Sequence, residues 1–364
     1  MRKTINKLFL IITVISALLL TTGCDLFIKT NKGQVDQKWY MGLTYEDDNG
    51  NDTDYTIGTD GTIAAVALED GYGDEFGIIK GEEAYLNINT IIKNIDKRFY
   101  VDATNNLVMF TDATKTYKTK IGGKTINETE NTDYVISFMD GKNCYVNVKF
   151  VKKYVDFDYK VVKAEGKSPA RIVLKYTSGE KNQMTVKSNI EMRTKADYQN
   201  LIVTTLKKNT KVTVLEESGD WTKVGTDDGF MGYVPAKKLK DKETKKTEFK
   251  SDADTYTHVL MNKKISLGWN AITNLTANGN LETIIEHTKG LNVISPTWYS
   301  LSDNKGNLRS YASATYVEKA HSKGLKVWAL VNDFGTQDKA SKEYTKKVLT
   351  DTTKRENLVD NIMT

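Results

Sequence analysis

The sequence is short of cysteine and histidine, and its charge is nearly balanced. Its 364 residues include two cysteines and three histidines, and the net charge is +5. The histidines have no mutual spacing suited to a metal ion; they are His258, His287 and His321. The small positive charge is spread thinly along the chain, so it indicates no nucleic-acid partner. We therefore expect no metal site and no nucleic-acid binding.

Two short stretches resemble ligand-binding loops, but each lacks a glycine that the loop requires. Gly123-Lys-Thr125 resembles the end of a phosphate-binding loop, and Lys118 stands where the upstream glycine belongs. Residues 47–54 are rich in aspartate, yet Asp52 occupies the glycine position of a calcium loop. We expect neither a nucleotide nor a metal in these loops, and no cofactor elsewhere.

The first residues have the order of a secretion signal. Arg2, Lys3 and Lys7 give the signal a positive start, and residues 8–20 form an apolar run. This run is too short to cross about 30 Å of hydrocarbon comfortably as a permanent helix. Small residues follow, and then Cys24. We therefore expect residues 1–23 to be removed on export.

Residues 20–24, Leu-Thr-Thr-Gly-Cys, resemble the lipobox of bacterial lipoproteins. One position departs from that pattern, because Thr21 stands where leucine is preferred and Leu20 lies one place earlier. The resemblance implies that Cys24 carries a diacylglycerol, which would anchor the chain to the outer face of the cell membrane. Cys144 would then have no partner for an intrachain disulfide. The alternative is an ordinary cleaved signal with an incidental cysteine.

Residues 28–37 are polar, and we expect a tether over residues 24–38. Residues 39–178 contain an internal repeat. Between residues 39 and 79, short apolar runs alternate with turn signals and predict β-hairpins. Residues 85–101 and 145–161 share one apolar pattern, which predicts in each unit a strand and a helical turn that lead into a strand pair. The last strand of the pair is expected at residues 107–110 in the first unit and 172–176 in the second. The pattern resembles the stalk-type domain that also occurs at the N-terminus of copper amine oxidases. The resemblance implies a spacer or wall-contact element without metal or catalysis.

Residues 183–240 alternate short strands with glycine and asparagine turns, which is typical of a small closed barrel. The stretch includes Gly219-Asp-Trp221, and it ends on Gly232-Tyr-Val234 followed by Leu239. This order resembles the bacterial SH3-like domain, whose members often bind peptidoglycan peptides. The resemblance makes Trp221 a candidate for lining a ligand groove, and packing in the core is the alternative.

Beyond a charged stretch without periodicity, the pattern changes to alternating strands and helices. The charged residues 241–256 predict a linker, and the alternation fills residues 257–364. The expected strands are 265–270, 291–299 and 324–331, and the expected helices are 280–287, 311–323 and one beginning at residue 355. Such alternation predicts parallel strands that are joined by helices.

Three segments of this region are similar to glycoside hydrolase family 18, in its spore- and wall-associated branch: 293–301, 316–324 and 327–332. The family has a (β/α)8 barrel, with its chemistry at the C-terminal ends of the strands. The resemblance implies hydrolysis of β-1,4 bonds beside N-acetylglucosamine, in peptidoglycan or a chitin-like glycan. The family's catalytic glutamate ends an Asp-x-x-Asp-x-Asp-x-Glu motif on the fourth strand. The sequence contains no such motif, so we assign no catalytic residue.

The resemblance suggests three substrate-binding residues at the mouth of this barrel. Trp298 and Tyr299 lie at the end of the second strand, where aromatic rings could stack on sugars. Asp333 follows the third strand. Core packing or solvent exposure is the alternative for each. Residues 257–364 cover less than half of a barrel of about 250 residues, which predicts a truncated sequence or a segment that has lost its activity.

The sequence as a whole predicts a multidomain chain. It would consist of β-rich α+β repeats, a small SH3-like β-barrel and an incomplete (β/α)8 barrel. Two functions remain open. The first is a membrane-anchored cell-wall hydrolase of family 18, without its catalytic glutamate in this chain. The second is a non-catalytic surface lipoprotein that binds peptidoglycan.

Overall fold

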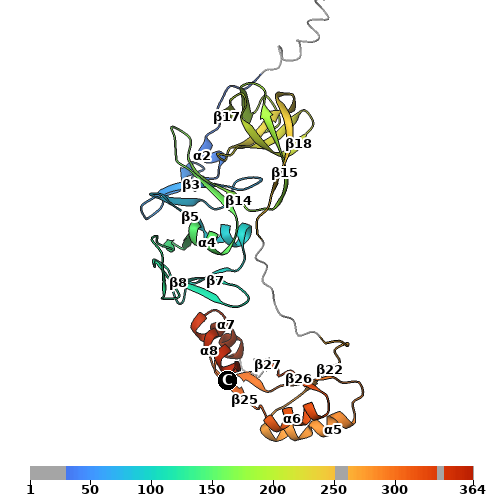
Figure 1. The fold of residues 1–364 in the computed structure, drawn as a ribbon. Helices are drawn as coiled ribbons and strands as arrows, with labels where there is room; N and C mark the ends of the chain where they lie inside the picture. The colour runs from blue at the N-terminus through green and yellow to red at the C-terminus, as the bar shows by residue number, and fades with distance from the viewer. Residues whose placement is uncertain (1–29, 251–260, 334–339, 364) are drawn as a thin grey trace, which may run out of the picture. The chain divides into compact units, whose positions relative to one another are not determined.

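The computed structural model describes residues 30–250, 261–333 and 340–363, and it is rich in β-strands (Figure 1). The chain divides into two compact units. The first unit contains residues 1–99 and 121–253, and the second contains residues 100–120 and 254–364. Among the described residues, no helix is long and apolar enough to cross a membrane.

A seven-stranded sheet forms one part of the first unit. Its strand order is β11-β12-β5-β4-β3-β14-β13, in which β14 and β3 are parallel and the other neighbours are antiparallel. The strands are β3 (Thr62–Ala67), β4 (Gly77–Lys80), β5 (Glu83–Asn87), β11 (Ser137–Asp140), β12 (Asn143–Asn147), β13 (Asp158–Val162) and β14 (Ala170–Lys175). Smaller elements flank it: α2 (Gln37–Tyr40), β1 (Thr44–Glu46), β2 (Asp52–Asp54), β9 (Thr125–Ile126) and β10 (Glu130–Asn131).

The internal repeat of the sequence is also a repeat of structure. The first copy runs through β5, α3 (Ile88–Thr90), the π-helical turn η1 (Ile91–Ile95), β6 (Phe99–Asp102) and β7 (Leu107–Thr111). The second copy runs through β12, α4 (Val148–Tyr154), β13 and β14. In each copy a buried asparagine ends the first strand and caps the helix. Asn87 accepts a hydrogen bond from the amide of Asn89, and Asn147 accepts one from the amide of Lys149, both at 2.9 Å. The predicted strand, helical turn and strand pair are therefore confirmed in both copies.

The SH3-like barrel predicted from residue 183 onward forms the other part of the first unit. Its antiparallel sheet has the order β17-β16-β20-β19-β18-β15-β21. The elements are β15 (Gly179–Val186), β16 (Ile190–Arg193), β17 (Ile202–Leu206), β18 (Lys211–Ser218), β19 (Trp221–Gly225), β20 (Met231–Pro235), η2 (Ala236–Lys238) and β21 (Leu239–Thr247). Alternate residues such as Met192, Val224 and Val234 are buried in one core, as the strand pattern of the sequence requires.

Residues 30–36 lie against this barrel, although their polar composition predicts a tether. The amide of Val35 donates to the carbonyl of Ile202, and the amide of Ile202 donates to the carbonyl of Gly33, each at 2.9 Å. Val35 is buried in the barrel core. The tether prediction does not hold for this part of residues 24–38. A buried valine, backbone hydrogen bonds and a hydrogen bond from the Arg193 side chain to Asn31 hold the segment, and composition does not reveal such contacts.

The charged stretch predicted as a linker begins as a strand. β21 continues to Thr247 and pairs with β15 along its length, from Leu239 opposite Val186 to Thr247 opposite Gly179. Most of its side chains are exposed, and the backbone makes the ladder bonds. Charge patterning therefore missed the strand, and the predicted start of the linker at residue 241 is wrong.

The second unit contains the predicted alternation of strands and helices. β22 (Leu267–Asn270), β23 (Val293–Pro296) and β26 (Lys326–Val327) form a parallel sheet in that order. The remaining elements are η3 (Leu275–Asn280), α5 (Leu281–Glu286), β24 (Tyr299–Leu301), β25 (Leu308–Ser310), α6 (Ala314–Ser322), β27 (Val331–Asn332), α7 (Ala340–Leu349) and α8 (Thr352–Met363). The predicted strand 291–299 is divided after Pro296, where the chain turns and the amide of Trp298 donates to the carbonyl of Pro296 at 2.9 Å. The parallel order is confirmed, but three strands do not establish a (β/α)8 barrel.

The second unit also contains a hairpin from the first repeat, which joins β8 (Thr116–Lys120) in a three-stranded sheet. Asp102, at the end of β6, accepts hydrogen bonds from the amide and hydroxyl of Thr352 at 2.7 and 2.5 Å. Asn105 donates to the same carboxylate through its amide at 3.0 Å and its side chain at 2.9 Å. Burial raises the pKa of Asp102, but these hydrogen bonds outweigh burial and lower the pKa to about 2. Asp102 therefore ties the hairpin to the start of α8.

Replacing Asp102 with asparagine is expected to destabilise the second unit by about 2 kcal/mol, because an amide nitrogen cannot accept the donors that meet the carboxylate. The pKa is lower in the folded state, so this contribution is complete above about pH 4 and is lost as the pH falls toward 2. Urea unfolding at about pH 6 and pH 3 measures both effects. Glu318→Gln, an exposed control on α6, should change neither. A D102N variant as stable as the parent at pH 6 would contradict the assignment.

Candidate functional site

Trp221 is the first residue of β19, and it lies opposite Pro235 at the end of β20. Its side chain is partly exposed. The register between β19 and β20 places both residues at one end of the barrel, beside the short helix η2. The structure thus puts the predicted ligand residue on an accessible part of the barrel.

Tyr198 packs against Trp221, and sequence reasoning missed it. The two ring centroids are 4.8 Å apart and the rings meet edge to face at 63°. Tyr198 lies in the loop between β16 and β17 and is its only aromatic residue. A lone aromatic in a polar loop is the signal that could have found it. We call Tyr198 and Trp221 the aromatic pair.

Arg193 fixes the loop that carries Tyr198. Its side chain is only 2% exposed, and one guanidinium nitrogen donates to the carbonyls of Asn31 at 2.9 Å and Asn200 at 2.7 Å. A second nitrogen pairs with Glu191. The guanidinium also lies 5.8 Å from the centre of the Tyr198 ring. A buried cation with several acceptors holds the loop in one conformation, so the aromatic pair is preformed.

Comparison with known protein families supports the SH3-like prediction for this part of the chain. Residues 188–240 match the family of the bacterial SH3 domain. No curated protein and no solved structure matches the chain. Bacterial SH3 domains often bind cell-wall peptidoglycan, and the matched range includes Arg193, Tyr198, Trp221 and Pro235.

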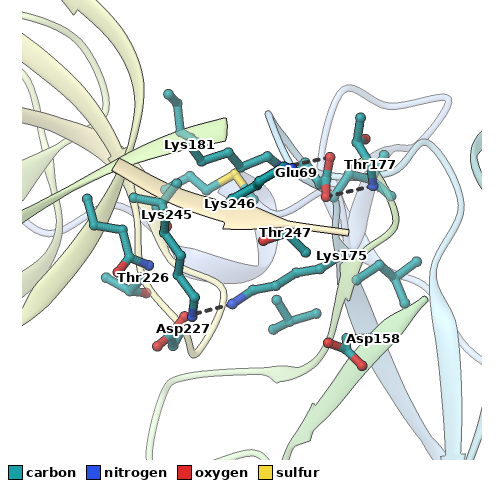
Figure 2. Close-up of a pocket in the computed structure, with 18 of the residues that line it drawn as sticks. Glu69, Asp158, Lys175, Thr177, Lys181, Thr226, Asp227, Lys245, Lys246 and Thr247 are labelled. Carbon is teal, nitrogen blue, oxygen red and sulfur yellow. Dashed lines mark hydrogen bonds and ion pairs between the residues drawn. The ribbon is translucent and has the colours of Figure 1, made fainter. Parts of the chain in front are cut away.

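A hollow of about 350 Å³ lies where the bacterial SH3 domain meets the seven-stranded sheet, inside the first unit (Figure 2). Val173, Leu215 and Met231 give it an apolar lining. Lysines and carboxylates also line the hollow, and Lys175 donates to Asp227 at 3.0 Å (dashed in Figure 2). The hollow is therefore amphipathic, with both signs of charge at its edge.

The structure places the sugar-binding candidates of the second unit in different surroundings. Trp298 is 4% exposed, its indole nitrogen donates to Asn278 at 2.8 Å, and its ring packs edge to face on Tyr316. This position favours the packing alternative for Trp298. Tyr299 is partly exposed, and Asp333 accepts a hydrogen bond from Thr345 at 2.9 Å. None of these three residues lines the hollow of Figure 2.

Of the two cysteines, the structure describes Cys144 and not Cys24. Cys24 lies outside the described residues, so its lipidation stays a prediction. Cys144 is 2% exposed on β12, and burial raises its pKa to about 12. Among the described residues, no group of three or more histidine, cysteine or acidic side chains could hold a metal ion.

The thiol of Cys144 is expected to be unreactive in the folded protein. In a Cys24→Ser variant, a chromogenic disulfide reagent should modify it more than about 100-fold slower in buffer than in urea, since thiolate and access are both lacking. Equal rates in buffer and urea would show that β12 is not packed as described.

Proposed function

We propose that this chain binds peptidoglycan through its bacterial SH3 domain, with the aromatic pair as the contact surface. One observation carries the proposal. Tyr198 and Trp221 are partly exposed, touch one another, and are held in place by the buried Arg193. Rigid aromatic rings give a large contact area at little entropic cost, which suits a weakly structured wall peptide.

Co-sedimentation with purified sacculi tests this proposal. The full chain should bind saturably to sacculi that have been stripped of protein and of anionic wall polymers. Soluble muropeptides carrying the stem peptide should compete, whereas glycan strands without peptides should not. Binding that disappears with the removal of anionic polymers would mean simple charge attraction and would overturn the proposal.

We further propose that Cys24 carries a lipid and that the chain stays on the outer face of the cell membrane. Asn31 and Val35 are bonded to the bacterial SH3 domain. The few residues between Cys24 and Asn31 span at most about 25 Å when fully extended. The anchor would then hold this domain near the membrane, and the repeats would not act as a spacer between them. Loss of membrane association in a Cys24→Ala variant is the expected result, and unchanged association would refute the anchor.

A second candidate function rests on the second unit. We propose that β22, β23 and β26, with α5 and α6, are the first part of a sugar-hydrolase barrel of the family 18 type. Large side chains on or beside these strands are exposed, Trp269 by 77% and Trp328 by 37%, as on a sheet that further strands would cover. The 364-residue chain should release no reducing sugar from peptidoglycan or chitin, because it has no catalytic glutamate motif. Reading the coding sequence past Thr364 decides the matter: an in-frame Asp-x-Asp-x-Glu supports the hydrolase, and its absence overturns it.

A further inference from the structure

Residues 31–35, which lie just before α2, pair with the loop that carries Tyr198. The backbone amide of Asn31 donates to the carbonyl of Tyr198 at 2.9 Å. The side-chain amide of Asn31 donates to the carbonyl of Gln199 at 3.0 Å. One residue near the N-terminus of the described chain thus holds the backbone on both sides of the Tyr198–Gln199 peptide bond. We call residues 31–35 the strap.

Farther along, the strap pairs with the start of β17. The amide of Ile202 donates to the carbonyl of Gly33, and Gln34 forms a parallel bridge with Ile202. The two backbones approach closely, because a Cβ atom at Gly33 would lie 3.0 Å from the Leu201 side chain. The strap therefore runs as a short parallel strand along the loop that holds Tyr198.

Arg193 joins the strap to the same loop. One nitrogen of its buried guanidinium donates to the carbonyl of Asn31 at 2.9 Å and to the carbonyl of Asn200 at 2.7 Å. The guanidinium also lies 5.8 Å from the centre of the Tyr198 ring. The strap, the loop and the ring of Tyr198 are thus parts of one network of contacts.

The internal hydrogen bonds of the loop do not hold Tyr198 itself. The amide of Thr194 donates to the carbonyl of Leu201 at 3.0 Å, and the amide of Asn200 donates to the carbonyl of Asp197 at 3.2 Å. The carbonyl of Tyr198 takes its hydrogen bond from the strap. If the strap left, this carbonyl would face water, and the backbone of Tyr198 would be free to move away from Trp221.

The first residues of the strap can separate from the barrel without opening its core. Val35 is buried, whereas Lys32, Gly33 and Gln34 are exposed. Hydrogen bonds of exposed backbone are readily exchanged for bonds to water, so this part of the strap opens at a lower free energy than the core. The strap therefore has a closed state and an accessible open state.

We propose that the strap is a positioning element of the wall-binding site, which holds Tyr198 against Trp221 and releases it when the N-terminal end of the chain is drawn away. Asn31 is the positioning residue, because its bonds to the Tyr198 loop are the first that a pull from residue 30 meets. Closure of the strap and binding at the aromatic pair favour one another, since coupling between two sites is reciprocal. The inference rests on the proposed function and adds its regulation: load from a membrane anchor would weaken binding to the wall.

Two deletions in the full chain test the strap. Deletion of residues 25–33 removes Asn31 and Gly33 and keeps Val35, and deletion of residues 25–29 shortens the chain but keeps the strap. Without ligand, the longer deletion should speed hydrogen exchange in residues 198–202 about tenfold. It should also lower the affinity for sacculi about tenfold, while the urea midpoint of the first unit changes little. The shorter deletion should change none of these quantities.

Unchanged exchange or unchanged affinity in the longer deletion would overturn the inference, and so would a lower urea midpoint without a loss of affinity. The exchange measurement needs no ligand. A parent chain that does not bind sacculi would therefore refute the proposed function, whereas a strap deletion that binds as well as the parent would refute only the role of the strap.

A point substitution tests Asn31 without shortening the chain. Asn31→Ala removes the side-chain bond to Gln199 and should lower the affinity for sacculi about threefold, with no change in the urea midpoint. Lys32→Ala, at the exposed neighbouring position, is the control and should leave the affinity unchanged. Equal affinities of the two variants would show that Asn31 does not position the loop.

The response to load is tested by the point of attachment. Chains are fixed to a surface through the Cys24 thiol, or through a cysteine added after Thr364 in a Cys24→Ser chain; Cys144 is buried in both. Under equal flow, sacculus fragments should leave the chains fixed at Cys24 about threefold sooner, because the load then passes through the strap. Equal bound lifetimes would overturn the coupling to load.

Discussion

Replacing Trp221 with alanine is expected to lower the affinity of the chain for sacculi about 30-fold. Truncation removes one ring of the aromatic pair and leaves Tyr198 without its edge-to-face partner at 4.8 Å. Aromatic residues at the centre of a contact surface typically account for about 2 kcal/mol of binding free energy, which corresponds to this change in affinity. Co-sedimentation at increasing sacculus concentration measures it.

Trp39→Ala is the matched control for this variant. Trp39 is a tryptophan of the same unit, 55% exposed on α2, and it takes no part in the aromatic pair. Its removal should leave binding unchanged. Equal losses of affinity in the two variants would mean that sacculi bind exposed tryptophan without specificity. Unchanged affinity in the Trp221→Ala variant would show that the aromatic pair is not the peptidoglycan-binding site.

Replacing Arg193 with methionine is expected to destabilise the first unit by about 3 kcal/mol. The guanidinium is buried, and its removal leaves the carbonyls of Asn31 and Asn200 without their donor. Breaking a buried charge network by removing one partner typically costs about 3–5 kcal/mol, and the partial exposure of Glu191 places this case at the lower end. The urea midpoint of the first unit should fall accordingly, without a change in the second unit.

The Arg193→Met variant also tests whether Arg193 supports binding to sacculi apart from its effect on stability. At a temperature where R193M is folded, the loop of Tyr198 loses its anchor, so sacculus binding should still weaken. Lys208→Met, which removes an exposed cation of the same barrel, should alter neither the midpoint nor the binding. An R193M variant with normal stability and binding would show that the loop is held by its own backbone bonds alone.

The sequence predicted elements best where apolar spacing decides them. The repeat at residues 85–101 and 145–161 became two copies of the same strand, helix and strand pair, because buried alternation specifies both. The first copy still differs in one respect. Its hairpin belongs to the second unit through Asp102 and Thr352, a contact between residues far apart that no local pattern contains.

Two segments that pair with the barrel through their backbones were not predicted as part of it. Residues 30–36 and the charged strand β21 lack an apolar pattern, and each lies along the edge of a barrel whose free amides and carbonyls it satisfies. The SH3-like pattern made Trp221 a candidate contact residue, and its role in binding stays a prediction. Its partner Tyr198 could not be predicted, because the bend of a loop between two strands decides which ring it meets.

Hydrogen–deuterium exchange of the full chain, with and without soluble muropeptides, tests the central claim most directly. We predict slower exchange in residues 194–201 and 219–223, the two segments that carry the aromatic pair, and a smaller change in residues 30–36, which are bonded to them. Protection confined to residues 261–364, or none in the segments of Tyr198 and Trp221, would contradict peptidoglycan binding by the bacterial SH3 domain.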